Sequence, residues 1–163
     1  MTVTNNFILE NVSGLKNIII HIIIWSIFAM FCMEFTNLVA AEEIAVVVNI
    51  NNPVKSLTSR EVSDIFLARR KVFPSSDEAV FVVEQPQNSK LREEFFRLLN
   101  RMKLKQVNAY WARLQFSGDV QPPKALSNSQ AVIKVIRNNR YAIGYIDAES
   151  VDDSVHVILN LKD

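Results

Sequence analysis

The stretch IAVVVNINNPVKSLTSREVSDIF, residues 44–66, joins a short β-branched run to a helix-start signal. The run Ile44–Ile50 ends in the turn letters NNP, which predicts a buried strand followed by a turn. Thr58 and Glu61 have the spacing of a capping box, which predicts that a helix begins here. The apolar stripe of this helix consists of Val62, Ile65 and Phe66. The stretch therefore predicts a strand, a turn and a helix.

The same alternation continues to the C-terminus. Further strands are predicted at Ala79–Glu84, Tyr141–Ile146 and Val155–Leu161. Further helices are predicted over Leu91–Met102, around Val107–Leu114 and after a second capping box at Ser127–Gln130. The first helix is expected to end near Ala68–Lys71, and Phe116 is expected in or over the core. This order predicts an α/β fold with a mainly parallel sheet and helices on both of its faces.

Residues 1–41 have the organisation of a secretory signal peptide. The apolar run Ile18–Met33 follows Lys16, and small residues precede a cleavage position after Ala41. We expect residues 42–163 to form a single domain in the periplasm after cleavage. The alternative is an uncleaved membrane anchor, because the apolar run is slightly longer than the core of a usual signal peptide.

Composition and charge exclude several classes of function. Residues 1–41 contain one lysine and two glutamates, so the rest of the chain has a formal net charge of +2, against +1 for the whole. A nucleic-acid-binding protein would normally be strongly basic. His156 is the only histidine after residue 41, and the sequence contains no G-x-S-x-G turn and no metal-ligand spacing. We therefore expect no catalytic residues, no metal, no cofactor and no nucleic-acid partner.

The stretch EQPQNSKLREEFF, residues 84–96, places Ser89, Lys90 and Arg92 where a helix begins and where acidic side chains are usual. The free amides of the first turn, the Ser89 hydroxyl and the two positive charges can hold phosphate, sulfate or a carboxylate. The other interpretation is that Ser89 or Asn88 only caps the helix while Lys90 and Arg92 point to water.

Two further residues are of interest. Asn49 ends the first predicted strand and is expected either to face the same cleft as Ser89 or to form a turn. Gly144 lies within a predicted strand, where a glycine permits close approach of another element or marks a bulge.

Several motifs together resemble a known family. They are VVVNINNPVKSLTSREVSDIFLARRKVF (46–73), the loop containing Ser89, NAYWARLQFSGDVQPP (108–123) and YAIGYI (141–146). In this order they resemble the phosphate-binding-protein-like family of periplasmic solute receptors, in particular its short, single-lobe members. The resemblance extends from about Ile44 to Asp147. It implies one receptor-like α/β lobe, whereas full-length receptors have two lobes that close over the ligand.

The resemblance also implies a binding site. The family's strand-to-helix loop reads Arg, any, Asp, any, Ser, Gly, Thr, and Ser89 is the only residue here that matches it. Gln85 takes the place of the arginine, and Gln87, Lys90 and Leu91 take the other places. The candidate ligand-binding residues are Ser89, Lys90, Asn88, Gln87 and Asn49.

The function that the resemblance implies is a solute-binding-like protein linked to ABC-type uptake. Its ligand would be phosphate or another oxyanion, bound weakly, and its protein partner a membrane transporter or another envelope protein. The alternative is an accessory module, without a transport role, that binds a protein partner through the open face of the lobe.

Overall fold

The computed structural model describes residues 43–74, 76–118 and 120–163. They belong to one compact unit, Ala41–Asp163. None of the helices within these ranges has the length and hydrophobicity of a membrane-spanning helix. The predicted signal peptide, its cleavage position and the alternative membrane anchor all lie outside the described residues. They stay predictions, as do the domain bounds derived from them.

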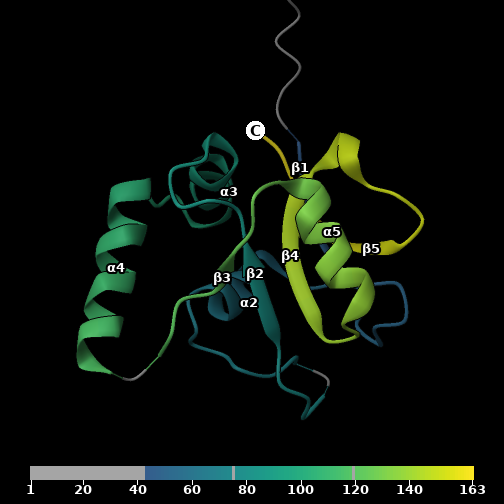
Figure 1. The fold of residues 1–163 in the computed structure, drawn as a ribbon, viewed down its shortest axis with the longest axis horizontal. Coiled ribbons are helices and arrows are strands. Elements are labelled where there is room, and N and C mark those ends of the chain that lie inside the picture. The colour runs from purple at the N-terminus through teal and green to yellow at the C-terminus, as the bar shows by residue number, and fades with distance from the viewer. Residues whose placement is uncertain (1–42, 75, 119) are drawn as a thin grey trace, which may run out of the picture. The chain divides into compact units, whose positions relative to one another are not determined.

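The described residues form an open five-stranded sheet flanked by four α-helices (Figure 1). The strands are β1 (Ile44–Asn49), β2 (Phe81–Glu84), β3 (Lys124–Ala125), β4 (Ala142–Asp147) and β5 (Val155–Leu161). The helices are α2 (Ser59–Phe66), α3 (Lys90–Asn100), α4 (Leu104–Ser117) and α5 (Ser129–Asn138), with a 3-10 turn η1 at Ala148–Ser150. The strand order is β3-β2-β4-β1-β5. β1 is antiparallel to both of its neighbours, while the other four strands share one direction. The sheet is therefore mixed, and the expected α/β fold is confirmed.

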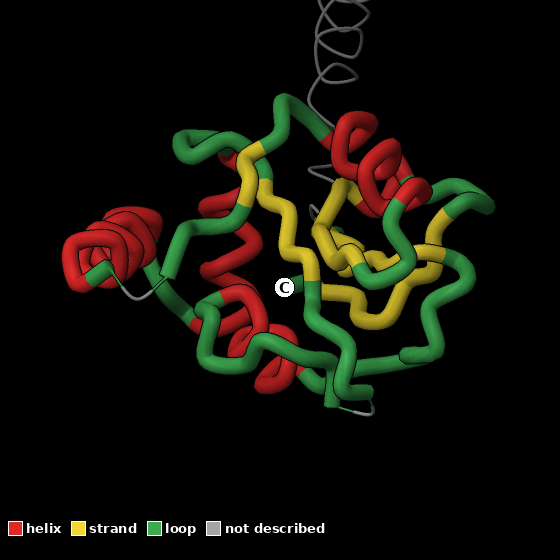
Figure 2. Tube along the Cα trace, turned by 60° about the horizontal axis from the view of Figure 1, so that its bottom comes forward, coloured by secondary structure: helices red, strands yellow, loops and turns green. Residues whose placement is uncertain are grey.

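The interior strand β1, between β4 and β5, is buried along its whole length and divides the core into two parts. On one face, Ile44, Val46 and Val48 pack in the cluster that includes residues of α2, α3 and α4. On the other face, Ala45 and Val47 pack in the cluster that includes residues of α5. Figure 2 shows the strands between α5 on one side and α2 and α3 on the other. Helices therefore cover both faces of the sheet, as predicted.

The start of α2 agrees with its prediction, whereas the start of α5 and the end of α2 differ from theirs. Thr58 and Glu61 form the predicted capping box of α2. The α5 cap is Asn128, whose Oδ1 accepts from the amide of Ala131 at 2.9 Å, and not Ser127 as the second capping box predicted. Helix α2 ends at Phe66, before the basic run that was expected to complete it.

Helix α4 lies at the edge of the fold, on the outer side of α3 (Figures 1 and 2). Its buried residues are Val107 and Trp111, and the hydroxyl of Tyr110 donates to the carbonyl of Leu67 at 2.7 Å. Phe116 is 97% exposed, which corrects the expectation that it would join or cover the core. Few side chains of α4 therefore attach it to the rest of the fold.

Gly144 is required by the packing of α5 on the sheet. A Cβ at this position would lie 2.7 Å from Cγ1 of Val132 and 2.9 Å from Cγ2 of Val83. The irregularity in the sheet lies instead between β1 and β5, at Val46 and Val47. Of the two roles expected for Gly144, close approach is therefore the one that the structure supports.

Replacement of Gly144 by alanine should lower the free energy of unfolding by about 1–3 kcal/mol, because both valines would have to move. Chemical denaturation of the full chain measures this change. Gly118→Asn is the control: Gly118 is an exposed αL cap at φ 77° with open space around it, and asparagine tolerates this conformation. Equal stability of Gly144→Ala and the natural chain would contradict the packing argument.

Candidate functional site

The loop between β2 and α3 contains three of the five candidate ligand-binding residues, and a fourth, Lys90, is the first residue of α3. Ser89 is the N-cap of α3, and its Oγ accepts a hydrogen bond from the amide of Arg92 at 3.1 Å. The amide of Ser89 donates to the carbonyl of Pro86 at 2.9 Å, so the loop closes on itself just before the helix. Ser89, and not Asn88, therefore caps the helix.

The tip of α3 lies at the protein surface. Gln87, Asn88 and Lys90 are exposed and Ser89 is half-buried. No hydrogen bond joins the amide of Leu91 to any residue that the structure describes. Amides of a first helical turn lack partners within the helix and carry the positive end of its dipole. The structure thus brings these four residues together around an accessible helix N-terminus.

Asn49 lies at the end of the sheet opposite to Ser89. Because β1 is antiparallel to β4, the last residue of β1 lies beside the first residue of β4. Its side-chain Nδ2 donates to the carbonyls of Ile136 at 2.9 Å and Arg137 at 2.8 Å, at the end of α5, and its Oδ1 accepts from the amide of Asn51. The expectation that Asn49 faces the same cleft as Ser89 is therefore corrected, and its turn-forming role is the one observed.

Gln85 is buried, and its side-chain nitrogen is hydrogen-bonded within the fold. Its Nε2 donates to the carbonyl of Tyr145 at 3.0 Å and to Oγ of Ser129 at 3.4 Å. Ser129 in turn donates to Oδ2 of Asp147 at 2.8 Å. This network connects the end of β2 with α5 and β4, and no local pattern of residues predicts it. At the position where the motif of the family that this sequence resembles has an arginine, this chain thus has a neutral side chain that holds elements together.

Arg92 is buried beneath the tip of α3, which corrects the expectation that it points to water or holds an anion. It is 3% exposed, and its Nε donates to Oε2 of Glu84 at 2.7 Å. One terminal nitrogen donates to the carbonyl of Gln87 at 3.2 Å and to Oδ1 of Asn108 at 2.7 Å. Arg92 therefore neutralises the last residue of β2 and attaches the loop and α4 to it.

Burial dominates the electrostatics of this ion pair. Glu84 is 4% exposed, and desolvation raises its pKa while the guanidinium of Arg92 opposes the increase. The guanidinium also lies 5.3 Å from the ring centroid of Phe96. A buried pair of this kind gives little net stability, but removal of one partner leaves a charge without compensation.

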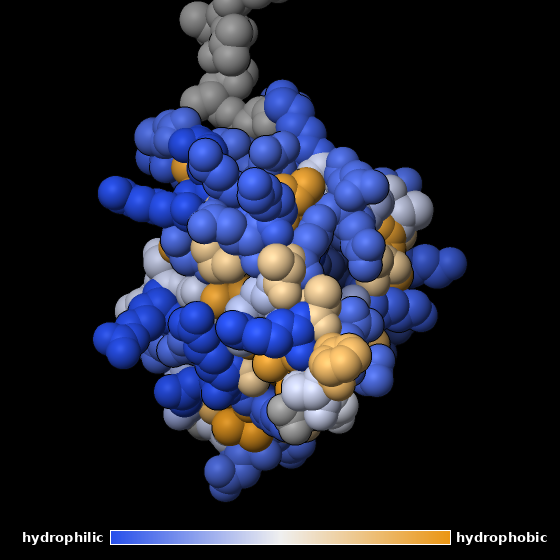
Figure 3. All heavy atoms as spheres, turned by 90° about the vertical axis from the view of Figure 1, so that its left-hand side faces the viewer, coloured by the Kyte–Doolittle hydropathy of each residue, from blue (hydrophilic) through white to orange (hydrophobic). Residues whose placement is uncertain are grey.

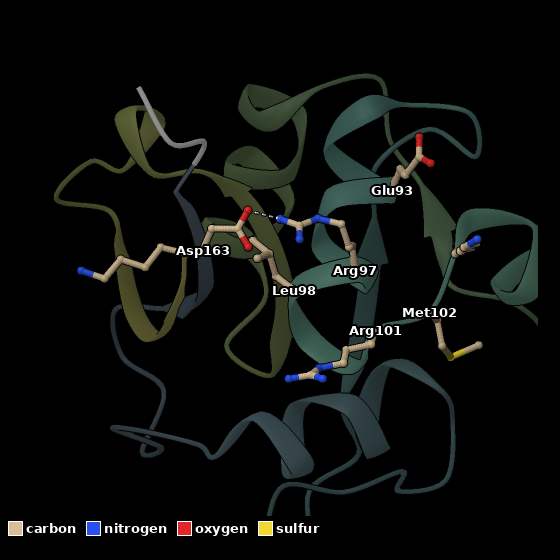
Figure 4. Close-up of a pocket in the computed structure, with 8 residues that line it drawn as sticks. Glu93, Arg97, Leu98, Arg101, Met102 and Asp163 are labelled. Carbon is tan, nitrogen blue, oxygen red and sulfur yellow. Dashed lines mark hydrogen bonds and ion pairs between the residues drawn. The ribbon is translucent and has the colours of Figure 1, made fainter. Parts of the chain in front are cut away.

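A hollow of about 800 Å³ lies along α3 beside the C-terminus (Figure 4). Arg97 and Asp163 point toward each other there, and Arg97 also pairs with Glu94. The hydrogen bond from Arg97 holds the pKa of Glu94 below its usual value, and Lys90 adds a smaller effect in the same direction. Arg97, in the middle of this hollow, is thus paired with carboxylates.

Within the described ranges, no three His, Cys, Asp or Glu side chains gather as metal ligands.

Neither a known protein-family profile nor a curated protein sequence matches this chain. Solved structures do match. One is a Clostridium perfringens protein described as a phosphate ABC transporter substrate-binding protein with bound phosphate. The TM-score is 0.58 at 24% identity, over 72% of this chain and 45% of that chain. Another is an ABC-type phosphate transport receptor from Vibrio cholerae, with a TM-score of 0.57 at 25% identity over the same shares.

A third similar structure is a protein from Planctomyces limnophilus described as a phosphate-binding protein. Its TM-score is 0.56 at 17% identity, over 74% of this chain and 42% of that chain. The chain spans less than half the length of each of these three proteins, which fits one lobe. The resemblance to phosphate-binding proteins of ABC transporters is thus confirmed in the fold.

Arg92→Met should destabilise the protein by about 3–5 kcal/mol, because Glu84 would remain buried without its partner. The double variant Arg92→Met, Glu84→Gln should recover part of this loss, since it leaves no charge behind. Denaturant unfolding of the full chain at pH 7 measures both values. A double variant less stable than Arg92→Met would contradict this account of the pair.

Proposed function

We propose that this protein is a solute-binding-like lobe that binds phosphate or a similar oxyanion weakly at the N-terminus of α3. The observation that carries the proposal is the accessible tip formed by Gln87, Asn88, Ser89 and Lys90, in a fold similar to phosphate receptors. The tip follows β2 at the edge where the strands that share one direction end, and this is the edge at which open α/β sheets bind ligands.

Three groups at the tip suit an anion. The amide of Leu91 offers a donor at the positive end of the helix dipole. The Ser89 hydroxyl can donate to a bound oxygen while its own oxygen accepts from Arg92. Lys90 adds a positive charge at the first helical position. Together they form a shallow site for one oxyanion.

The same geometry makes binding weak. Gln85 provides no charge and its amide is already bonded within the fold, while Arg92 is committed to Glu84. The tip is also exposed, so a small ligand would keep much of its contact with water. We therefore expect a dissociation constant of about 1 mM or weaker, which is a binding free energy of about −4 kcal/mol.

The cellular role that we propose follows from the comparisons and from residues 1–41. The similar proteins are described as transport receptors or binding proteins, and we assign no catalytic step to this chain. We propose export to the periplasm by the N-terminal signal peptide. There the protein would serve ABC-type uptake beside a membrane transporter.

The second candidate function is an accessory module that binds a protein partner through the same open face. The exposure of Gln87, Asn88 and Lys90 favours it, because a partner's carboxylate could use the donors that an oxyanion would use. In that case the tip contributes to a larger interface and free phosphate has no measurable effect.

Titration of the full chain with phosphate, at constant ionic strength, should shift the NMR amide signals of Ser89 and Leu91 with millimolar or weaker affinity. Ser89→Asp should abolish these shifts, because aspartate retains the N-cap but adds a negative charge at the site. Asn128→Asp is the matched control, since it makes a similar change at the α5 cap.

A flat titration would refute the oxyanion site and leave the protein-partner alternative. Sub-micromolar binding of phosphate would refute the argument that the site binds oxyanions weakly. Equal phosphate binding by Ser89→Asp and the natural chain would place any anion site elsewhere.

A further inference from the structure

A groove of about 480 Å³ lies beside β2, and we call it the β2 groove. Its lining comes from the end of α2, from residues 70–71 and 79–82, from Trp111 of α4 and from residues 120–124. We propose that the β2 groove binds a small amphiphilic anion, a molecule with one negatively charged head group and an apolar tail.

The backbone leaves part of the β2 edge uncovered beside this groove. The amide of Phe81 donates to the carbonyl of Tyr141, next to β4, at 3.0 Å, so the amide of Val80 points to the opposite edge. There it donates to the carbonyl of Lys71 at 2.9 Å, while β3 pairs with the same edge only from Val83 onward. Among the described residues, no strand therefore pairs with this edge between Lys71 and β3.

The walls of the groove are apolar. Ile65 and Trp111, which are 1% and 5% exposed, belong to its lining, so the groove extends to the edge of the core. Phe81 is 41% exposed. Further apolar lining residues are half-buried: Ala68, Val80, Val82, Val120, Pro122 and Pro123. Figure 3, which views the side that carries α4, shows apolar side chains lying between hydrophilic ones. A hollow of this volume with such walls suits an apolar group, because ligand pockets measure about 300–1,000 Å³.

The charged residues of the lining are all basic. They are Arg70, Lys71 and Lys124, and each is exposed. No ion pair joins any of them to a carboxylate of the described residues. The nearby Arg69 and Asp64 pair with each other at 3.6 Å. The lining thus attracts a negative head group and repels a positive one, while its walls accept the tail.

The β2 groove is separate from the tip of α3. None of its lining residues belongs to the loop between β2 and α3, and the tip follows the last residue of β2, whereas Phe81 is the first. The inference therefore does not rest on oxyanion binding at Ser89.

The test is an NMR titration of the full chain with octanoate. Octanoate should shift the amide signals of Val82 and Val120 saturably, with a dissociation constant on the order of millimolar. Octylammonium should bind at least about fivefold more weakly, because the basic residues of the lining repel its charge. Butyrate should also bind at least about tenfold more weakly, since it has a shorter tail to bury.

Phe81→Ser should weaken octanoate binding at least about fivefold, because it removes apolar surface from the groove. Phe116→Ser is the matched control: it is the same substitution at a phenylalanine that is 97% exposed and does not line the groove. Octanoate binding by this control should equal that of the natural chain.

The double variant Lys71→Gln, Lys124→Gln keeps the apolar walls and should weaken octanoate binding about threefold or more. Both lysines are exposed, so this variant keeps the test decisive if Phe81→Ser does not fold. The double variant Lys105→Gln, Lys134→Gln is its control, because it loses the same charge at exposed positions outside the groove.

Absence of a saturable shift with octanoate would overturn the proposal. Octylammonium binding as tightly as octanoate would also overturn it. Equal weakening by Phe81→Ser and Phe116→Ser, or by the two double variants, would overturn it as well, since the probe would then bind elsewhere. Phosphate titration at Ser89 should be unchanged in Phe81→Ser, so the two proposed sites can fail separately.

Discussion

The burial of β1 on both faces is the constraint on which the rest of the fold depends. All six of its residues are buried, and its side chains alternate between two separate clusters. Burial of one valine or isoleucine side chain contributes about 1.5–3 kcal/mol, so neither face of this strand can remain in water. Helix α5 must therefore cover one face, while α2 and α3 cover the other. The position of the α3 tip follows from this arrangement, because α3 is held between the sheet and α4.

Short sequence patterns predicted the elements that depend on interactions between residues close together in the chain. The capping box at Thr58 and the apolar run Val155–Leu161 were both found where the sequence placed them. The direction of β1 was not predictable, because an unbroken apolar run such as IAVVV carries no signal for the direction in which the strand pairs with its neighbours. This is why one of the two expectations for Asn49 placed it in the same cleft as Ser89, whereas the turn is the one observed. Strand β3 has only two residues and owes its existence to pairing with β2, so it left no pattern to detect.

The strand, polar loop and helix around the candidate site were clear from the sequence, but the burial of its charges was not. The cap was left open between Ser89 and Asn88, and the structure assigns it to Ser89. The burial of Arg92 depends on Glu84 and Asn108, which lie 8 and 16 residues away in the chain and meet it only in the folded protein. Likewise, Gln85 meets Tyr145 across 60 residues. Gln85 in the loop and Arg92 in the first turn of α3 thus serve the interior, while Ser89 and the amide of Leu91 lie at the tip.

The short strand β3 has a consequence for how separate copies of this protein meet. It pairs only with Val83 and Glu84, so the outer side of β2 at Phe81 and Val82 is not covered by a named strand, and Phe81 is 41% exposed. An uncovered sheet edge can recruit a strand from another molecule and begin aggregation. Here the segment alongside contains Pro122, Pro123 and Lys124, and prolines cannot donate to a ladder while a lysine resists dehydration. The edge thus carries its own protection against intermolecular β-pairing.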